Sequence, residues 1–179
     1  MKTAKDIRDF WFAGTVQPYW FARSDEVDAR IKTDFAEVYE AAHRGDLDHW
    51  MENAADALSL VIALDQFPRN LFRGSGRSFE SNDIALTHAR TALDRGYDQD
   101  LSETERQFFY LPFMHSEMLA DQNRSVKLYK ALGNENALDF AHQHRDIIAQ
   151  FDRFPHRNAV LGRDNTPEEA EFLKTHSGF

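Results

Sequence analysis

Hydrophobic residues recur at intervals of three and four positions along most of the chain, which is the spacing of a helix with one buried face. The pattern is clearest between Ser24 and Gly45, where Ser24 is a candidate N-cap. The apolar positions in that segment are Val27, Ile31, Phe35, Val38 and Ala42. A shorter segment from Thr3 to Gly14 places Ile7, Phe10 and Trp11 on one side. Both segments predict amphipathic helices.

The most hydrophobic segment runs from about Asp48 to Leu64 and is apolar nearly all round. We therefore expect a helix in the centre of the fold, ended by Pro68. The next helix should end at Gly96. It carries a stripe of apolar and mostly small residues, namely Ile84, Ala85, Ala89, Ala92 and Leu93. Small side chains allow a close contact with a neighbouring helix.

The second half of the chain continues the helical pattern. Residues 102–105 spell Ser-Glu-Thr-Glu, a capping box, and the helix that they start contains Pro112, where we expect a break. Further helices are expected at 125–132 and 136–151. Residues 166–169 combine an N-cap threonine, a proline and a glutamate, which predicts a short last helix.

No segment alternates between apolar and polar positions as a half-buried strand would, so the expected fold class is all-α. A length of 179 residues, with 42% hydrophobic and 28% charged residues, is typical of one globular domain covering residues 1–179. The 15 Phe and three Trp residues favour helix contacts filled by aromatic rings. They are also compatible with a homodimer contact.

Charge and composition exclude several classes of protein. A formal net charge of −9 opposes nucleic-acid binding, which needs a clustered basic surface. The absence of cysteine excludes disulfides and thiolate metal sites. The longest apolar run, Leu58 to Leu64, is far shorter than the roughly 20 residues that span a bilayer, and the first residues lack the apolar core of a secretory signal. We therefore expect a cytoplasmic protein without a membrane partner.

One short pattern occurs twice. The segment "LDQFPRN" at 64–70 returns as "FDRFPHRN" at 151–158, with His156 as the only insertion. Each copy follows a hydrophobic helix, and its proline should force the preceding phenylalanine out of helical geometry. Asp65 and Asp152 then lie in the last helical turn, where the helix dipole disfavours a carboxylate. Each aspartate should therefore have a cationic partner, and the local arginines are the candidates.

The polar residues of the two repeated turns form two candidate clusters. They are Arg69, Asn70 and Arg73 in the first, and Arg157, Asn158 and Arg163 in the second. One interpretation is that the arginines brace helix ends by binding carbonyls and carboxylates. The other is that the two clusters face each other across a groove and bind a carboxylate or phosphate group with the fork geometry of guanidinium.

Acidic residues lie between the two turns, in the segment from Tyr110 to Gln122. Glu117 and Asp121 are four apart on one predicted helical face, with His115 on a neighbouring face. Because two like charges repel, their most economical partners are the arginines of the repeated turns. The functional alternative is a general acid–base pair or a divalent cation site.

Metal and nucleophile motifs are missing. His142 and His144 are two apart and point to different sides of a helix, and Asp139 with His142 is only half of a carboxylate-bridged di-metal motif. No phosphate-binding glycine-rich loop or nucleophile elbow is present. The sequence therefore predicts no metal or other cofactor. His156 is a candidate because it alone interrupts the repeat, although a loop or capping histidine is the plainer interpretation.

Three segments, "LDQFPRNLFRG", "YLPFMHSE" and "FPHRNAVLGR" followed by "TPEE", occur in the order found in a bacterial family of uncharacterised proteins. From about Phe10 to Leu173 the chain resembles this family, domain-of-unknown-function family 924. The resemblance implies antiparallel helix pairs stacked as a tetratricopeptide-like α–α superhelix, and it implies no activity. The matching polar positions are Asp65, Arg69, Asn70, Arg73, His115, Glu117, Asp121, Gln122, Arg153, His156, Arg157, Asn158 and Arg163. The chain departs from a true tetratricopeptide pattern, since no 34-residue period repeats.

Two functional hypotheses remain. The first is a binding module that holds an anionic small molecule or an acidic protein segment in an arginine-rich concave groove. Its ligand-binding candidates are Arg69, Asn70, Arg73, His115, Arg157, Asn158 and Arg163. The alternative is a small-molecule enzyme in which Glu117, Asp121 or His156 transfers protons and the arginines position an anionic substrate. Binding ranks first because no acid–base or nucleophile arrangement follows from the spacing.

Overall fold

The computed structural model describes residues 1–179 and consists of helices joined by turns and loops, without any β-strand. The all-α prediction is confirmed. No helix has the length and apolar character needed to cross a bilayer. The chain divides into two compact units: unit 1 contains residues 1–73 and 77–112, and unit 2 contains residues 74–76 and 113–179. A single domain over the whole chain stays a prediction.

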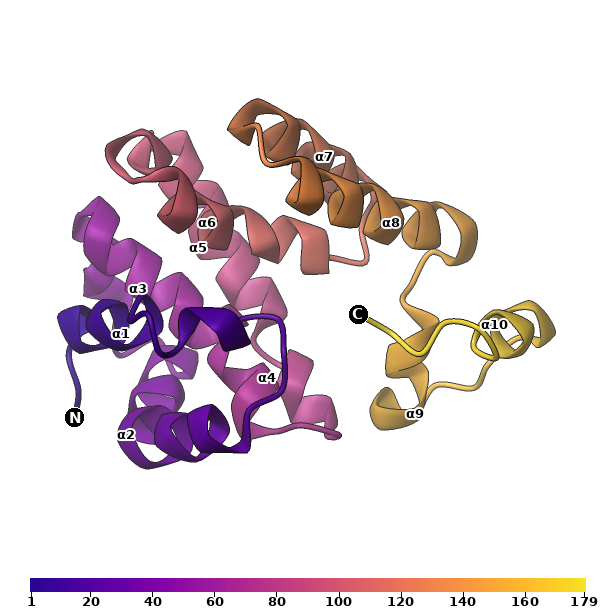
Figure 1. The fold of residues 1–179 in the computed structure, drawn as a ribbon, viewed down its shortest axis with the longest axis horizontal. Helices are drawn as coiled ribbons and strands as arrows, with labels where there is room; N and C mark the ends of the chain where they lie inside the picture. The colour runs from indigo at the N-terminus through magenta and orange to yellow at the C-terminus, as the bar shows by residue number, and fades with distance from the viewer. The chain divides into compact units, whose positions relative to one another are not determined.

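Unit 1 is built around one hydrophobic helix. Its helices are α1 (Ala4–Trp11), α2 (Asp25–His43), α3 (Ala54–Asp65), α4 (Phe67–Leu71), α5 (Asn82–Asp94) and most of α6 (Glu103–His115). The central helix α3 packs against α1, α2, α4 and α5 (Figure 1). Every residue from Ala57 to Asp65 is buried. An all-round apolar helix needs neighbours on every side, so the predicted central position is confirmed.

The second helix follows its sequence pattern closely. The Ser24 hydroxyl accepts a hydrogen bond from the Val27 N–H at 3.3 Å, which caps α2 as predicted. All five predicted apolar positions of this helix are buried. On α5, the Ala85, Ala89 and Ala92 side chains are fully buried, and α5 packs against α3. The small residues therefore serve the close helix contact that the sequence indicates.

The predicted helix from Asp48 to Leu64 is wrong at its start, whereas its end agrees with the end of α3 at Asp65 to one residue. Asp48–Glu52 is a separate 3₁₀ turn, and α3 begins after Asn53, whose side chain caps it by accepting from the Asp56 N–H at 3.0 Å. Pro68 does not end a helix either. It occupies an early position of α4, where a backbone N–H would have no intrahelical partner, so a proline is tolerated there. Phe67, which precedes it, is helical rather than extended as predicted from the sequence.

The break expected at Pro112 is also absent. The capping box is present, since the Ser102 N–H donates to Glu105 Oε2 at 3.0 Å and the Glu105 N–H donates to Ser102 Oγ at 3.4 Å. The helix α6 then continues through Pro112 to His115. A proline removes one helical hydrogen bond, and burial of Phe108 and Phe109, which are at most 1% exposed, offsets that loss.

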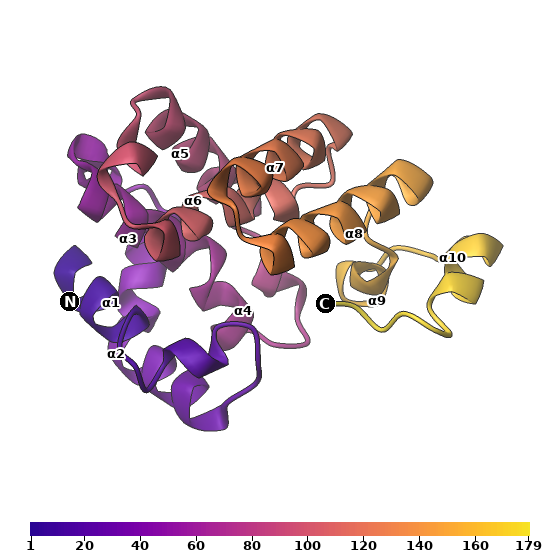
Figure 2. The same cartoon turned by 45° about the horizontal axis from the view of Figure 1, so that its top comes forward.

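Unit 2 contains a helical hairpin and a compact C-terminal part. Its helices are α7 (Leu119–Leu132), α8 (Glu135–Phe151), α9 (Asn158–Leu161) and α10 (Pro167–Phe172). The helices α7 and α8 run antiparallel and side by side in both ribbon views (Figures 1 and 2). Gly133 connects them in the left-handed conformation, with φ of 78°. Stacking into a tetratricopeptide-like superhelix stays a prediction.

The core of unit 2 forms where α8 meets the segment that follows it. Ile147, Ile148 and Phe154 are buried together, and Phe151 and Phe172 pack against them. The capping box at the start of α10 is present as predicted. The helix α7 begins at Leu119 rather than at Ser125. This earlier start places Asp121 inside a helix and Glu117 in the connection before it.

Candidate functional site

The first repeated turn uses its arginines to hold unit 1 together. Arg69 donates to the Asp65 carbonyl and, at 3.2 Å, to Asn82 Oδ1. Its Nη1 lies 3.5 Å from the carboxylate of Asp65, which is 1% exposed. Asp65 therefore has the arginine partner that its position at a helix end predicts.

Asn70 and Arg73 bind an aspartate on another helix. Arg73 forks onto Asp28 of α2, with Nε 2.6 Å from Oδ2 and Nη2 2.9 Å from Oδ1, and Asn70 Nδ2 donates to Oδ1 at 2.7 Å. Burial raises the pKa of Asp28, but hydrogen bonds from Arg73 and Asn70 outweigh it and the pKa is lowered. This first cluster ties the end of α4 to α2.

The second repeated turn has a different geometry. Asp152 caps the end of α8 in the left-handed conformation with φ of 58°, is exposed and makes no ion pair, so the predicted arginine partner for it is wrong. Phe154 is extended and buried before Pro155, as predicted. The two repeated turns therefore differ in structure although their sequences are similar.

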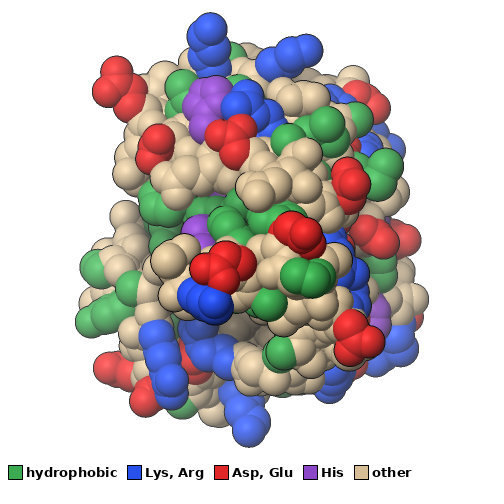
Figure 3. All heavy atoms as spheres, turned by 90° about the vertical axis from the view of Figure 1, so that its right-hand side faces the viewer, with side chains coloured by type: hydrophobic (Ala, Val, Ile, Leu, Met, Phe, Trp, Pro, Cys, Tyr) green, Lys and Arg blue, Asp and Glu red, His purple; other side chains and the backbone are tan.

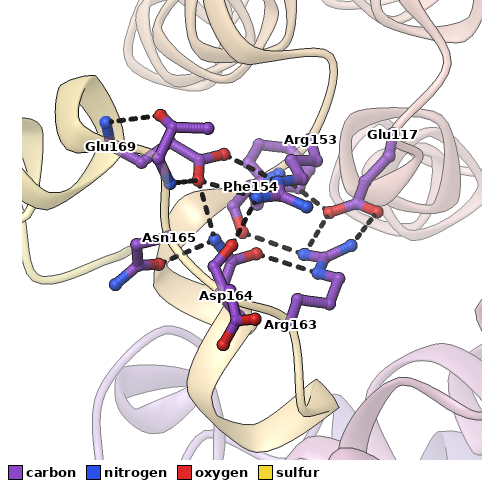
Figure 4. Close-up of polar contacts among 9 residues, drawn as sticks. Glu117, Arg153, Phe154, Arg163, Asp164, Asn165 and Glu169 are labelled. Carbon is purple, nitrogen blue, oxygen red and sulfur yellow. Dashed lines mark hydrogen bonds and ion pairs between the residues drawn. The ribbon is translucent and has the colours of Figure 1, made fainter.

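Glu117 is the acid that meets the second turn. It accepts the Phe154 N–H at 2.8 Å and a fork from Arg163, with Nη1 2.8 Å from Oε2 and Nη2 3.0 Å from Oε1 (Figure 4). The predicted pairing with an arginine of this turn is therefore present. The predicted shared helical face with Asp121 is wrong, because Glu117 lies between α6 and α7, and Asp121 accepts from the Ser116 hydroxyl at 2.8 Å.

Hydrogen bonds keep Glu117 ionised. Burial raises its pKa, but the donors from Arg163 and the Phe154 N–H outweigh burial, so the pKa lies below its ordinary value. A carboxyl group that stays charged at neutral pH is a poor proton donor. The geometry of Glu117 is that of a structural ion pair.

A second fork joins α10 to the same turn. Arg153 donates to Glu169 through Nε at 2.6 Å and Nη2 at 2.7 Å, and Glu169 also accepts from the Thr166 N–H at 2.8 Å and Asn158 Nδ2 at 3.2 Å (Figure 4). The Arg153 hydrogen bonds lower the pKa of Glu169 to about 2 against the opposing effect of burial. The sequence predicted Glu169 only as a capping residue.

One signal for this pair was present in the repeat. The spacer between aspartate and Phe-Pro is Gln66 in the first copy and Arg153 in the second. A charged residue that replaces a neutral one at this position indicates a carboxylate nearby in the second turn. The carboxylate is Glu169, which is 2% exposed and would not be stable there without a partner.

The fork of Arg163 leads to a stability prediction. Replacing Arg163 by Lys should lower the free energy of unfolding by about 1–2 kcal/mol, because an ammonium group cannot reproduce two parallel hydrogen bonds to one carboxylate. The matched control is Arg145→Lys, since Arg145 pairs with the exposed Asp146 on the surface of α8. Chemical denaturation of both variants measures the difference. Equal effects would show that the Glu117 fork contributes no more than a surface pair.

Unit 2 also contains a cluster that the sequence did not define. His144 of α8 is 6% exposed, and its Nδ1 lies 2.8 Å from the Phe140 carbonyl oxygen. A carbonyl can only accept, so Nδ1 carries the proton and Nε2 is the acceptor nitrogen of the neutral ring. The His144 ring centroid lies 5.6 Å from that of Phe154, in an edge-to-face arrangement.

Three further side chains surround Phe154 and His144. The His156 ring centroid lies 5.5 Å from that of Phe154, and the Arg157 guanidinium lies 4.3 Å above the Phe154 ring and donates to the His115 carbonyl at 3.0 Å. The ring centroids of His115 and His144 are 6.5 Å apart. We call His115, His144, Phe154, His156 and Arg157 the histidine cluster.

Two histidines of the cluster, His144 and His156, are neutral at pH 7. Burial, and then His115, lower the pKa of His144 to about 3. Burial, and then the charge of Arg157, lower the pKa of His156 to about 4. The buried Nδ1 of His156 has no hydrogen-bond partner. No three His, Cys, Asp or Glu side chains are arranged to hold a metal ion.

The structure divides the predicted site residues between the two units. Unit 1 holds Arg69, Asn70 and Arg73. Unit 2 holds His115, Glu117, Asp121, His156, Arg157, Asn158 and Arg163. One groove that contains both sets stays a prediction. Acidic and basic side chains are interspersed on the face shown in Figure 3, where a histidine is visible among hydrophobic side chains.

Comparison with known proteins agrees with the sequence motifs. Residues 7–177 match the model of the family described as bacterial protein of unknown function (DUF924). A solved structure titled "Structure of Protein of Unknown Function ATU0120 from Agrobacterium tumefaciens" is 43% identical, with 97% of each chain covered and a TM-score of 0.92. No curated protein matches the chain. The resemblance is confirmed, and the chain belongs to the DUF924 family of bacterial proteins.

Proposed function

We propose that the protein is a binding module for an anionic small molecule and that the ligand binds at the histidine cluster of unit 2. One observation carries the proposal: His144 and His156 both contact the Phe154 ring, at 5.6 and 5.5 Å between centroids, and the Arg157 guanidinium lies 4.3 Å from the centre of the same ring. Nε2 of His144 is an acceptor nitrogen, and Nδ1 of His156 has no hydrogen-bond partner. Buried polar atoms in native proteins are usually hydrogen-bonded, so such atoms mark a candidate binding position.

The remaining arginines favour a structural role. The guanidinium forks of Arg73, Arg153 and Arg163 are used by the protein's own carboxylates. These pairs support the bracing interpretation for both repeated turns. The proposed site therefore contains fewer arginines than the predicted arginine-rich groove.

An anion fits the electrostatics of the cluster. The charge of Arg157 lowers the pKa of both His144 and His156, so its positive field reaches both rings. A carboxylate or phosphate beside them would be attracted to the charge of Arg157. Because His144 and Arg157 are each 6% exposed, a small molecule fits this position better than a protein segment.

The enzymatic alternative receives less support. Glu117 is held in an ion pair with a lowered pKa, and Asp121 accepts from Ser116. The lowered pKa of Glu117 makes it a poor general acid. His156 is the one acid–base candidate that remains, and its neighbours include the rings of Phe154 and Phe179.

A ligand-dependent thermal shift tests the proposal. Inorganic phosphate, citrate and phenylpropionate, each at constant ionic strength, are compared with chloride. At 100 times its dissociation constant a ligand stabilises the folded state by about 2.7 kcal/mol. We expect at least one of the three anions to raise Tm and His156→Gln to abolish that shift, since His156 makes no side-chain hydrogen bond and its replacement should leave the fold intact.

The matched control is His142→Gln. His142 lies two positions before His144 on the same helix and takes no part in the cluster. It should keep the full ligand response. If none of the three anions stabilises the protein, or if both variants respond equally, the proposed anion site is wrong.

A further inference from the structure

The segment His176–Phe179 returns to the histidine cluster. The Phe179 ring stacks on His144, with ring centroids 3.6 Å apart and planes inclined by 16°. Its centroid is 5.0 Å from that of His176, and the His156 ring stands nearly perpendicular to it at 6.0 Å. The Phe140 ring approaches at 6.4 Å. We call these four neighbours, namely Phe140, His144, His156 and His176, the aromatic cage.

The cage holds Phe179 in an unusual state for a large apolar side chain. Phe179 is 51% exposed, whereas His144 beneath it is 6% exposed. The ring therefore covers a buried imidazole without being part of the core. Contacts with the surrounding rings and the burial of about half of its surface keep it there.

The backbone of the segment approaches the cluster closely but is not bonded to it. Gly178 has φ of +112°, and a Cβ there would lie 3.2 Å from Cδ2 of His156. The Gly178 N–H donates to His176 Nδ1 at 3.3 Å, within the segment itself. Each stacked pair of rings changes the equilibrium between the docked and the released segment by only about 2- to 12-fold. A ligand at moderate concentration can therefore displace it.

We infer that the aromatic cage is the aryl subsite of the anion site and that Phe179 occupies the place of a ligand ring. The ligand is then a small carboxylate or phosphate that carries one aromatic ring. This inference rests on the proposed function. Its geometric basis is Phe154, which contacts both His144, at 5.6 Å between centroids, and the guanidinium of Arg157, at 4.3 Å. Only the Phe154 side chain therefore separates a ring stacked on His144 from the Arg157 guanidinium, which would bind the acidic group of the same ligand.

Three related probes separate the ring from the charge. Phenylpropionate has both, cyclohexylpropionate has the charge without an aromatic ring, and phenylpropanol has the ring without the charge. Dissociation constants are measured by isothermal titration calorimetry on the full chain. We expect phenylpropionate to bind most tightly, because only this probe stacks on His144 and also meets Arg157.

Removing the internal competitor should strengthen binding. Phe179→Ala should tighten phenylpropionate binding by at least about 2- to 12-fold, which is the contribution of the stacked pair with His144 alone. The matched control is Phe21→Ala, since Phe21 is a 70% exposed phenylalanine of unit 1 that stacks on Phe108. The control should leave the affinity unchanged.

Substitution of the stacking partner gives an independent measurement. His144→Ala should abolish the preference for phenylpropionate over cyclohexylpropionate, whereas His144→Phe should keep it because a ring remains. If His144→Ala does not fold, His144→Phe and Phe179→Ala carry the test. Loss of the preference in His144→Phe as well would overturn stacking as the basis of the subsite.

The outcomes separate this inference from the proposed function. Equal affinity for phenylpropionate and cyclohexylpropionate, with no effect of Phe179→Ala, overturns the aryl subsite and leaves the anion site standing. Equal affinity for phenylpropionate and phenylpropanol supports the cage and overturns the anion site. No binding of any probe to Phe179→Ala overturns both.

Discussion

Replacing Glu169 by Gln should lower the free energy of unfolding by about 3 kcal/mol at pH 7. The carboxylate is 2% exposed and accepts hydrogen bonds from Arg153, Asn158 and the Thr166 N–H. Its pKa of about 2 in the folded protein, against an ordinary value of 4.5, corresponds to about 3 kcal/mol of stabilisation of the charged form. Glutamine keeps the size of the side chain but leaves Arg153 without a charge partner. Chemical denaturation measures the loss.

The neighbouring Glu168 provides the control, because it is exposed and the substitution is chemically identical. Glu168→Gln should change stability by less than about 0.5 kcal/mol. Because the folded pKa of Glu169 is depressed, its contribution is present above the unfolded pKa near 4.5 and is lost as the pH falls toward 2. Equal losses for the two variants would mean that the buried pair with Arg153 contributes nothing to stability.

Features that depend on neighbouring residues could be predicted from the sequence. The caps at Ser24, Ser102 and Thr166 are all present. Each needs only a serine or threonine and a backbone N–H three positions later. The buried face of α2 follows from spacing alone. For α5 the spacing identifies the three buried alanines, whereas Ile84 and Leu93 are half-buried and Leu86 is buried as well.

The effects of the two internal prolines could not be predicted in the same way. A proline removes one hydrogen bond wherever it stands, and packing decides whether the helix continues. Pro68 occupies an early position of α4, and Pro112 lies inside α6 among residues that are almost fully buried. A single sequence shows the proline but does not show that burial.

The repeated turns show a second limit. Asp65 and Asp152 occupy the same place in the repeat, yet only Asp65 has an arginine partner. The acids that bind the other turn arginines are Asp28 and Glu117, which lie 45 and 46 positions away from Arg73 and Arg163 along the chain. Such partners depend on tertiary packing, so a local repeat cannot identify them.

The candidate site could be predicted only in part. His156 and Arg157 were candidates because they stand in an irregular copy of a repeated turn. His144 entered the sequence analysis only as a histidine two positions from His142, and its role depends on Phe154 and Phe179, which reach it from later segments of unit 2. Because these residues come from three separate segments of the chain, they have no fixed sequence spacing by which the cluster could be recognised.

Acidification should destabilise the protein before its carboxylates titrate. The folded pKa values of His144 and His156 are about 3 and about 4, against an unfolded value near 6.5. Below pH 6.5 the unfolded chain therefore binds protons that the folded protein does not bind, and stability falls as the pH decreases. Between pH 7 and pH 5 the two rings together should lower the free energy of unfolding by about 4 kcal/mol. The charged or titratable groups that face these rings are His115, Arg157, His176, Glu117 and Arg163.

The slope of stability against pH isolates the contribution of His144. One proton changes the slope by about 1.4 kcal/mol per pH unit, so His144→Phe should reduce the slope between pH 6 and pH 5 by about that amount. His88 of unit 1, whose pKa burial also lowers, is present in both proteins and cancels in the comparison. Denaturation midpoints at several pH values give the two slopes. If the slopes are equal, His144 takes up its proton in the folded protein as readily as in the unfolded chain, and the ring is not held neutral by the cluster.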